Sequence, residues 1–216
     1  MTQHSADPGP RDYRTRAERR EELLDAAALV VRDEGVAGLS TRAVAARAGV
    51  AHGVVHYVFG ARRNLTEALL ERQTRTVLPV VLRAADEHDD LHGALSGAVR
   101  TYLGMLRREP ERFRMLEALG ASGFDGRGDT ELLAGERRRW HEAVVAGIEH
   151  WLARHGQRTT VPVAVLADAV IALVDGLARA AWGDPDGSAT DAAAALLVDA
   201  VARAASSPVD PGTGGP

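Results

Sequence analysis

Residues 39–65 read LSTRAVAARAGVAHGVVHYVFGARRNL and predict two short helices joined by a tight turn. Ser40 is a good N-cap for a helix over residues 41–48, because its hydroxyl can accept a hydrogen bond from an otherwise unpaired backbone N–H. Gly49 follows, and glycine tolerates the positive φ that a sharp turn between helices often needs. A second helix is expected over residues 51–58.

The second of these helices is short and is expected to depend on its neighbours. Val55 and Val58 are its predicted buried points. Gly53 lies inside it and costs about 1 kcal/mol of helix stability relative to alanine. Because an isolated helix of this length is marginal in water, packing against other helices has to hold it in place.

The charge of this segment favours a DNA-binding motif over a hairpin that only packs. The window from Gly35 to Thr66 contains no Asp or Glu, but it contains Arg42, Arg47, Arg62 and Arg63. A solvated helix face usually mixes charges of both signs. A helix-turn-helix, in contrast, places one helix in the major groove while flanking cations meet phosphates.

Residues 16–65 resemble the DNA-binding domain of the tetracycline-repressor (TetR) family of bacterial regulators. The family pattern T-x-R-x-I-A-x-x-A-G-V-S-x-x-x-L-Y-Y-H-F-x-S-K-E-x-L is matched here by STRAVAARAGVAHGVVHYVFGARRNL. By position, the resemblance implies contacts with the DNA backbone from Thr41, Arg42, Tyr57 and Arg62, and base-facing positions at His52, Gly53, Val54 and His56.

Three positions depart from the family pattern. Ala51 replaces the usual serine, so the second helix lacks a side-chain N-cap. His56 replaces a common tyrosine, and Val58 replaces a common histidine. Because histidine and valine do not follow the simple arginine–guanine or asparagine–adenine pairings, the operator sequence cannot be deduced from these side chains.

Composition bounds the class of protein. The chain has 216 residues, 45% of them hydrophobic and 26% charged, which is ordinary for a globular protein. It contains no cysteine, and all 26 basic residues are arginine, which excludes thiolate chemistry, lysine Schiff bases and phosphate-binding P-loops. The net charge is −4, yet residues 1–75 carry 12 arginines against 10 acidic residues. DNA affinity would therefore come from a local, salt-sensitive patch.

The sequence predicts an all-α fold with an N-terminal three-helix helix-turn-helix domain and a C-terminal helical ligand-binding and dimerisation bundle, because no strand-like alternation is present. Residues 1–15 are predicted to be a disordered arm, 16–63 the DNA-binding domain, 64–206 the ligand-binding and dimerisation domain, and 207–216 a disordered tail. Further helices are expected over residues 16–34, 64–85, 90–108, 110–119, 130–154, 162–182 and 190–205, with a loop over 120–129 and a kink or break at Pro79.

The last two predicted helices are rich in alanine and carry apolar stripes. One stripe consists of Val163, Leu166, Val170, Leu173 and Leu177, and the other of Leu196, Leu197, Val198 and Val201. Both stripes could simply fill the core of their own domain. The family resemblance implies instead that these helices, over residues 162–182 and 190–205, pair across a two-fold axis, so that a homodimer reads a palindromic double-stranded DNA operator.

The resemblance also implies a cavity for an unknown small-molecule effector within the C-terminal helices, with no other cofactor. The candidate lining residues are Tyr102, Met105, Phe113, Met115, Trp140, His141, Val144, Trp151, Leu173 and Asp175, and Leu106 and Leu116 are candidates on the same grounds. An aromatic or Met side chain at helical spacing is more often ordinary core. The predicted function is thus a ligand-released transcriptional repressor.

Other functions are less well supported. No nucleophile–base pair or phosphate loop is recognisable, so an enzyme is not expected, and a helical adaptor is the remaining alternative. His52 and His56 have zinc-compatible spacing, but Gly53 stands where a metallopeptidase needs Glu. The acidic and histidine cluster over residues 87–92 is better explained by helix capping than by metal binding. No stretch of about twenty apolar residues and no secretory signal is recognisable. This predicts a cytoplasmic, nucleoid-associated protein without membrane contact.

Overall fold

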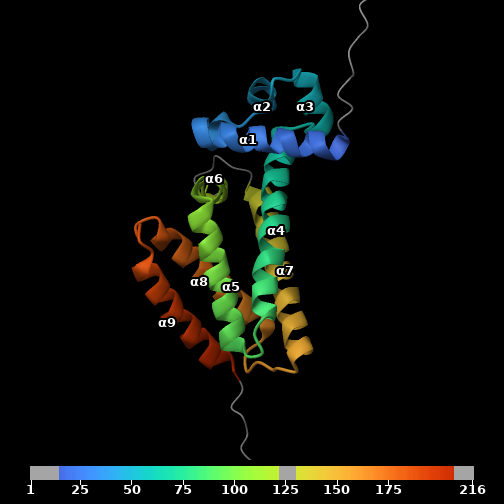
Figure 1. Cartoon of the computed structure of the whole chain (residues 1–216). Coiled ribbons are helices and arrows are strands. Elements are labelled where there is room, and N and C mark those ends of the chain that lie inside the picture. Colours follow the sequence, from blue (N-terminus) through green and yellow to red (C-terminus); the bar gives the residue numbers. More distant parts are fainter. Residues whose placement is uncertain (1–14, 122–129, 207–216) are drawn as a thin grey trace, which may run out of the picture. The chain divides into compact units, whose positions relative to one another are not determined.

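The computed structural model of the protein describes residues 15–121 and 130–206, and within them it contains nine helices and no strand (Figure 1). The predicted all-α fold is confirmed. The chain divides into two compact units, one ending at Leu69 and the other beginning at Leu70. All of the arm predicted over residues 1–15 except Thr15, the predicted tail, and nearly all of the loop predicted over residues 120–129 lie outside the described residues.

The N-terminal unit begins with a capped helix, α1 (Arg16–Gly38). The Thr15 hydroxyl accepts a hydrogen bond from the Glu18 N–H, and the Glu18 carboxylate accepts one from the Thr15 N–H at 2.8 Å. Two orphan donors of the first turn are thereby satisfied. Gly35, the predicted end of this helix, has a φ of 75° and interrupts the helical backbone before a last turn that reaches Gly38.

Three further helices complete this unit: α2 (Thr41–Ala48), α3 (His52–Phe59) and the first residues of α4 (Arg62–Asp86). α1 contacts α2, and α2 contacts α3. The fully buried side chains of the unit come from all four helices and from the residue that follows α1, and they include Leu23, Leu24, Val30, Leu39, Val44, Val55 and Leu65. The short helices α2 and α3 are therefore held by a shared core, as their length requires.

The C-terminal unit contains the rest of α4 with α5 (Leu91–Arg108), α6 (Pro110–Ala121), α7 (Thr130–His155), α8 (Val163–Ala181) and α9 (Ser188–Ala205). These bounds agree with the predicted helices to within a few residues. α4 continues through Pro79, so of the kink or break predicted at this proline the break does not occur. No helix in the described ranges is long and apolar enough to cross a bilayer.

The core of this unit is formed where α5, α8 and α9 contact one another. Leu166, Leu173 and Leu177 of α8 are buried there with side chains of α5 and α9. Most of the predicted α8 stripe thus fills the core of its own unit and is not an external face. The large apolar side chains that α8 and α9 leave exposed are Val165, Leu196 and Leu197, and the last two belong to the stripe predicted for α9.

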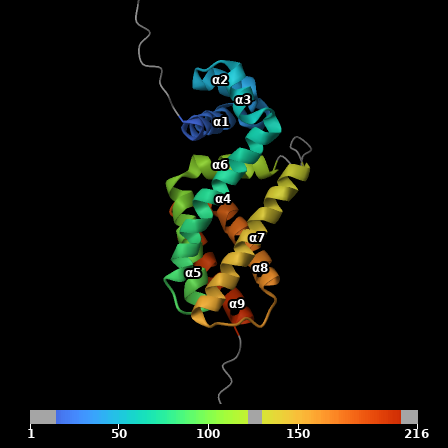
Figure 2. The same cartoon turned by 90° about the vertical axis from the view of Figure 1, so that its right-hand side faces the viewer.

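Two close approaches position α4 against its neighbours in the C-terminal unit. A Cβ atom on Gly97 of α5 would lie 2.7 Å from the backbone carbonyl oxygen of Ala84, so only glycine fits at this crossing. α4 and α7 lie next to each other in this unit (Figure 2). Near their C-terminal ends they are joined by an ion pair of 2.7 Å between Asp86 and Arg154. These contacts set the spacing of helices that surround an internal cavity.

The acidic and histidine cluster over residues 87–92 lies at the start of α5. The Asp90 side chain accepts a hydrogen bond of 2.8 Å from the Gly93 N–H and caps this helix. Within the described ranges, no group of three or more histidine and acidic side chains is arranged to hold a metal ion. The capping interpretation is supported at Asp90, whose side chain makes the cap.

Candidate nucleic-acid interface and internal cavity

The turn between α2 and α3 is built as its sequence predicts. The Ser40 hydroxyl accepts a hydrogen bond of 3.1 Å from the Ala43 N–H. Gly49 ends α2 with a φ of 65°, a left-handed conformation that glycine adopts without steric cost. Leu39 and Val44, which flank the cap, are both buried. The predicted N-cap and the predicted glycine turn are confirmed.

The buried side of α3 differs from the prediction at one position. Val55 is fully buried, but Phe59 is the second buried point, at 5% exposure, while Val58 is only half-buried. Residues four apart lie on the same helix face, so Phe59 and Val55 point together toward the core. The helix reaches Phe59, one residue beyond its predicted end, and Ala51 makes no side-chain cap, as expected.

The opposite side of α3 presents the residues that the family resemblance assigns to DNA bases. His52, Gly53 and His56 are exposed, and Val54 is half-buried. A Cβ atom on Gly53 would meet nothing within 4 Å, so this point of the helix is open to a close-fitting partner. This exposed part of α3 therefore has no side chain at Gly53 and carries an imidazole on either side of it in the sequence.

The side chains assigned to the DNA backbone are not all equally available. Tyr57 is 76% exposed, and the guanidinium of Arg16 lies 5.8 Å from its ring centroid. Arg42 is exposed at the start of α2. Arg62, in contrast, donates a hydrogen bond of 2.7 Å to the backbone carbonyl of Val36. Its guanidinium is thus partly engaged within the N-terminal unit.

Arg47 belongs to the acid-free window, yet an acid from α1 neutralises it. Its guanidinium lies 2.6 Å from the carboxylate of Asp33. Hydrogen bonds from Arg32 and then from Arg47 lower the pKa of Asp33 to about 2. Asp33 precedes the window in the sequence, so the pairing becomes visible only when α1 and α2 are placed together.

The two histidines of α3 do not form a metal site on their own. Their ring centroids are 6.3 Å apart, and the described residues provide no third histidine or acidic ligand with them. His52 instead has a neighbour across the turn, because its Nε2 lies 3.0 Å from the Thr41 hydroxyl oxygen.

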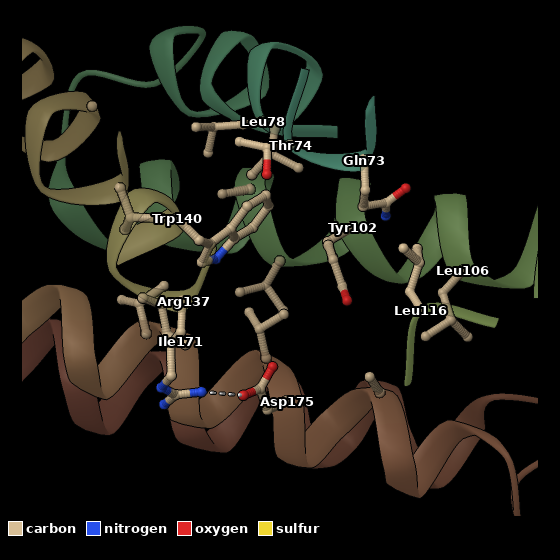
Figure 3. Close-up of a pocket in the computed structure, with 18 of the residues that line it drawn as sticks. Gln73, Thr74, Leu78, Tyr102, Leu106, Leu116, Arg137, Trp140, Ile171 and Asp175 are labelled. Carbon is tan, nitrogen blue, oxygen red and sulfur yellow. Dashed lines mark ion pairs between the residues drawn. The ribbon is translucent and has the colours of Figure 1, made fainter. Parts of the chain in front are cut away.

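A cavity of about 800 Å³ lies inside the C-terminal unit, between side chains of α4, α5, α6, α7 and α8 (Figure 3). Its wall is mostly apolar. It includes six of the ten main lining candidates, Tyr102, Phe113, Trp140, Val144, Trp151 and Asp175, and it also includes Leu106 and Leu116. All three tryptophans of the chain, Trp140, Trp151 and Trp182, belong to this wall.

Four of the predicted lining residues lie outside the cavity wall. Leu173 is on the face of α8 that packs into the α5 and α9 core. Met105 is buried with Val77 and Leu106. Met115 is also buried away from the wall, and His141 faces Asp168, with 3.3 Å between its Nε2 and a carboxylate oxygen. These four side chains serve packing or local pairing.

The cavity has a polar region built from α6, α7 and α8. Arg137 and Asp175 form an ion pair of 3.7 Å, drawn in Figure 3. Nearby, the Glu117 carboxylate lies 3.5 Å from Arg179 and accepts a hydrogen bond of 2.7 Å from the Trp182 indole N–H. The cavity thus combines apolar walls with charged groups of both signs.

Burial changes the acidity of two groups in this wall. Burial raises the pKa of Asp175, and Arg137 and Arg179 oppose that rise. Burial also raises the pKa of Tyr102, with smaller contributions from the nearby negative charges of Asp175 and Glu117. The Tyr102 hydroxyl therefore stays protonated at neutral pH and can donate a hydrogen bond.

Sequence reasoning missed several polar lining residues: Gln73, Thr74, Glu117, Arg137 and Arg179. One signal for Arg137 was present. It shares a helical face with Trp140, Val144 and Trp151, at spacings of three, four and seven residues. A charged side chain on an otherwise apolar face points to a functional or paired position. The other four carry no comparable signal.

The chain resembles known regulators in sequence. Residues 23–69 match the family model described as bacterial regulatory proteins, tetR family. An uncharacterised HTH-type transcriptional regulator of Mycobacterium tuberculosis, found in strains CDC 1551 and H37Rv, is 30% identical over 149 residues, which is 64% of this chain and 63% of the relative. The match thus spans less than two thirds of the length of these relatives.

Solved structures show the same architecture. The multidrug binding protein EbrR, complexed with imidazole, superimposes with a TM-score of 0.65 at 26% identity, covering 93% of this chain and 98% of its own. A transcriptional regulator from Rhodococcus sp. Rha1 superimposes with a TM-score of 0.66 at 25% identity, covering 88% and 98%. With its helix-turn-helix geometry, the segment over residues 23–69 is similar to the DNA-binding domain of the tetR family of bacterial regulatory proteins, and the chain shares the fold of solved regulators of this kind.

Proposed function

We propose that the chain is a transcriptional regulator that binds a palindromic DNA operator as a homodimer and is released by a small-molecule effector. The observation that carries the proposal is the exposed face of α3, which comes after a glycine turn inside a window without acidic residues. Such a face suits the major groove, and the match of residues 23–69 to the tetR family model supports the same interpretation. The protein would act in the cytoplasm, at the bacterial nucleoid.

Each part of the proposed DNA contact has a chemical role. Gly53 lets the helix backbone come close to base edges, and His52 and His56 supply ring nitrogens that can donate or accept hydrogen bonds. Tyr57 and Arg42 are placed to meet phosphates. Arg62 is a weaker candidate for a phosphate contact, because its hydrogen bond to Val36 would have to be kept or exchanged.

The proposed dimer would use the exposed apolar side chains of α8 and α9. Val165 is 53% exposed, Leu196 68% and Leu197 42%. An isologous pairing of these helices would cover all three side chains twice, once in each protomer. It would also provide two copies of α3 for the two halves of a palindrome.

The proposed effector is a small molecule with an apolar body and a polar group. A volume of about 800 Å³ falls within the range of drug-sized ligand sites. The Tyr102 hydroxyl and the Arg137–Asp175 pair are available to orient the polar group. α4 belongs to both units and is the natural route for coupling. The effector can shift the protein only by its difference in affinity for the two states.

The DNA-binding proposal is tested by fluorescence anisotropy on the region upstream of the protein's own gene. Arg42→Ala should weaken binding and reduce the slope of log affinity against log salt by about 1, as expected for one lost phosphate contact. Arg100→Ala, at an exposed arginine of α5, is the matched control and should change neither value. Equal behaviour of the two variants would contradict the assigned surface, and absence of wild-type binding would favour an adaptor.

The effector proposal has a direct optical test. Because every tryptophan lines the cavity, its occupation should change the intrinsic fluorescence. Neutral, cationic and anionic aromatic dyes of similar size provide the probes. Binding should quench the tryptophans, and Asp175→Asn should alter the ranking of the charged dyes while leaving DNA affinity unchanged without dye. Saturable quenching that leaves operator affinity unchanged would contradict the switch.

A further inference from the structure

A single side-chain hydrogen bond joins the start of α2 to the start of α3. The Thr41 hydroxyl oxygen lies 3.0 Å from Nε2 of His52, across eleven positions of sequence. Thr41 is the first residue of α2 and is half-buried, while His52 is the first residue of α3 and is exposed. In the described part of the chain, no other side-chain hydrogen bond connects these two helices.

This contact lies in the first turn of α3, where few other interactions fix the backbone. Ala51 contributes no side-chain cap, and Gly53 adds backbone freedom in the first turn. Among the described residues, Thr41 alone restrains the His52 ring by a hydrogen bond, whereas His56, one turn later, has no comparable anchor there. The two imidazoles of the same helix are thus held differently.

We propose that Thr41 is a positioning residue that sets the orientation and the tautomer of His52 for reading DNA, which rests on the proposed function. A hydroxyl has one donor and two acceptor sites. When the Thr41 O–H donates to a phosphate, its oxygen accepts the proton of Nε2–H from His52. The other ring nitrogen, Nδ1, is then an acceptor.

The hydrogen bond between Thr41 and His52 has a consequence for base preference. An acceptor on His52 matches bases that present an amino donor in the major groove, which are adenine and cytosine. Guanine presents only acceptors there and would be disfavoured as the base that His52 contacts. Without the hydroxyl, the ring is free to take either tautomer, so it can serve as donor or acceptor. Thr41 therefore sharpens the specificity of a contact that another residue makes.

The first test uses the free protein and does not depend on DNA binding. At about pH 8, where imidazole is neutral, ¹⁵N chemical shifts of the ring nitrogens report the tautomer. Thr41→Val, which keeps the shape and removes the hydroxyl, should change the ring shifts of His52 and leave those of His56 unchanged. Thr41→Ser should restore the wild-type values. Unchanged His52 shifts in Thr41→Val would overturn the coupling by itself.

The second test is a double-mutant cycle on the operator, with Thr41→Val, His52→Ala and the double variant. Direct coupling predicts that the two losses of affinity are not additive, by about threefold to tenfold. Thr41→Val should also flatten the discrimination against guanine at one position of each half-site, and Thr41→Ser should restore it. Additive losses with unchanged base preference would overturn the proposal, because Thr41 would then contact DNA independently. Failure of the wild-type chain to bind any DNA would instead refute the proposed function, while the ring shifts would still judge the coupling.

Discussion

The two units of the molecule use their surfaces in opposite ways. The N-terminal unit buries its apolar residues and presents histidine, glycine, tyrosine and arginine outward on α2 and α3. The C-terminal unit keeps its chemistry inside, around a cavity whose charged pairs lie among apolar walls. The proposed DNA-reading surface therefore depends on what one short helix exposes, whereas the proposed effector cavity depends on how five helices are spaced.

This difference predicts different responses to mutation. On the reading surface, one side chain can be exchanged with little effect on folding, because few neighbours touch it. Around the cavity, changes alter packing, and their effects on stability and on ligand binding are coupled. Substitutions in both units test this contrast.

The largest effect is expected at the proposed dimer face. Leu196→Glu places like charges on two apposed copies of α9 and should convert the dimer to a monomer. Operator affinity should then fall about 100-fold or more, because two linked reading helices bind far more tightly than one. Sedimentation and anisotropy measure both quantities. Val80→Glu, at another exposed apolar position, is the control, and an unchanged dimer in Leu196→Glu would exclude this face.

The second prediction concerns helix spacing in the C-terminal unit. In Gly97→Ala, the new Cβ would lie 2.7 Å from the Ala84 carbonyl oxygen, which is backbone and cannot rotate away. The free energy of unfolding should fall by about 1–3 kcal/mol. Urea titration followed by tryptophan fluorescence reports this unit specifically, because all three tryptophans lie in it. Wild-type stability would show that α4 and α5 adjust more easily than their geometry indicates.

Replacing glycine by alanine in α3 should have the opposite effect on the free energy of unfolding. Gly53→Ala meets nothing within 4 Å and replaces a poor helix former, so the N-terminal unit should gain up to about 1 kcal/mol. Operator affinity should fall, because the added methyl occupies space between the helix and the bases. Amide hydrogen exchange in α3 gives the stability, and anisotropy gives the affinity. Stronger DNA binding would argue against close backbone approach at this position.

The smallest effect is a pH dependence that arises from Asp33. Its pKa is lowered to about 2 by Arg32 and Arg47, so its contribution to stability is present above the unfolded value of about 3.9. That contribution is lost as the pH falls toward 2. The difference in thermal stability between wild type and Asp33→Asn should therefore be constant above about pH 4 and shrink below it. A difference that grows at low pH would contradict the sign.

The sequence predicted local features better than it predicted packing. Ser40 and Gly49 could be identified because a cap and a left-handed turn depend on one residue and its immediate backbone. Phe59 was missed in favour of Val58, since a shift of one residue at a helix end changes which side chain meets the core. Helix ends are where patterns are least decisive.

The cavity was harder to predict for a physical reason. A stripe of apolar residues has the same sequence pattern whether it packs against another helix, against a second protomer or around an empty space. The pattern therefore could not show that Leu173 belongs to the core and Val144 to the cavity wall. Partners distant in sequence decide the outcome. The Arg137–Asp175 pair joins residues from two helices, and neither residue alone indicated the other.

The continuity of α4 places a restriction on how this protein can be rearranged. The boundary between the two units falls between Leu69 and Leu70, inside a helix and not in a loop. A residue inserted or deleted there would shift every later residue of the helix by about 100° of rotation and about 1.5 Å of rise. If the N-terminal unit were exchanged between relatives, α4 would keep its helical phase across the junction only when the length changes in steps close to whole turns.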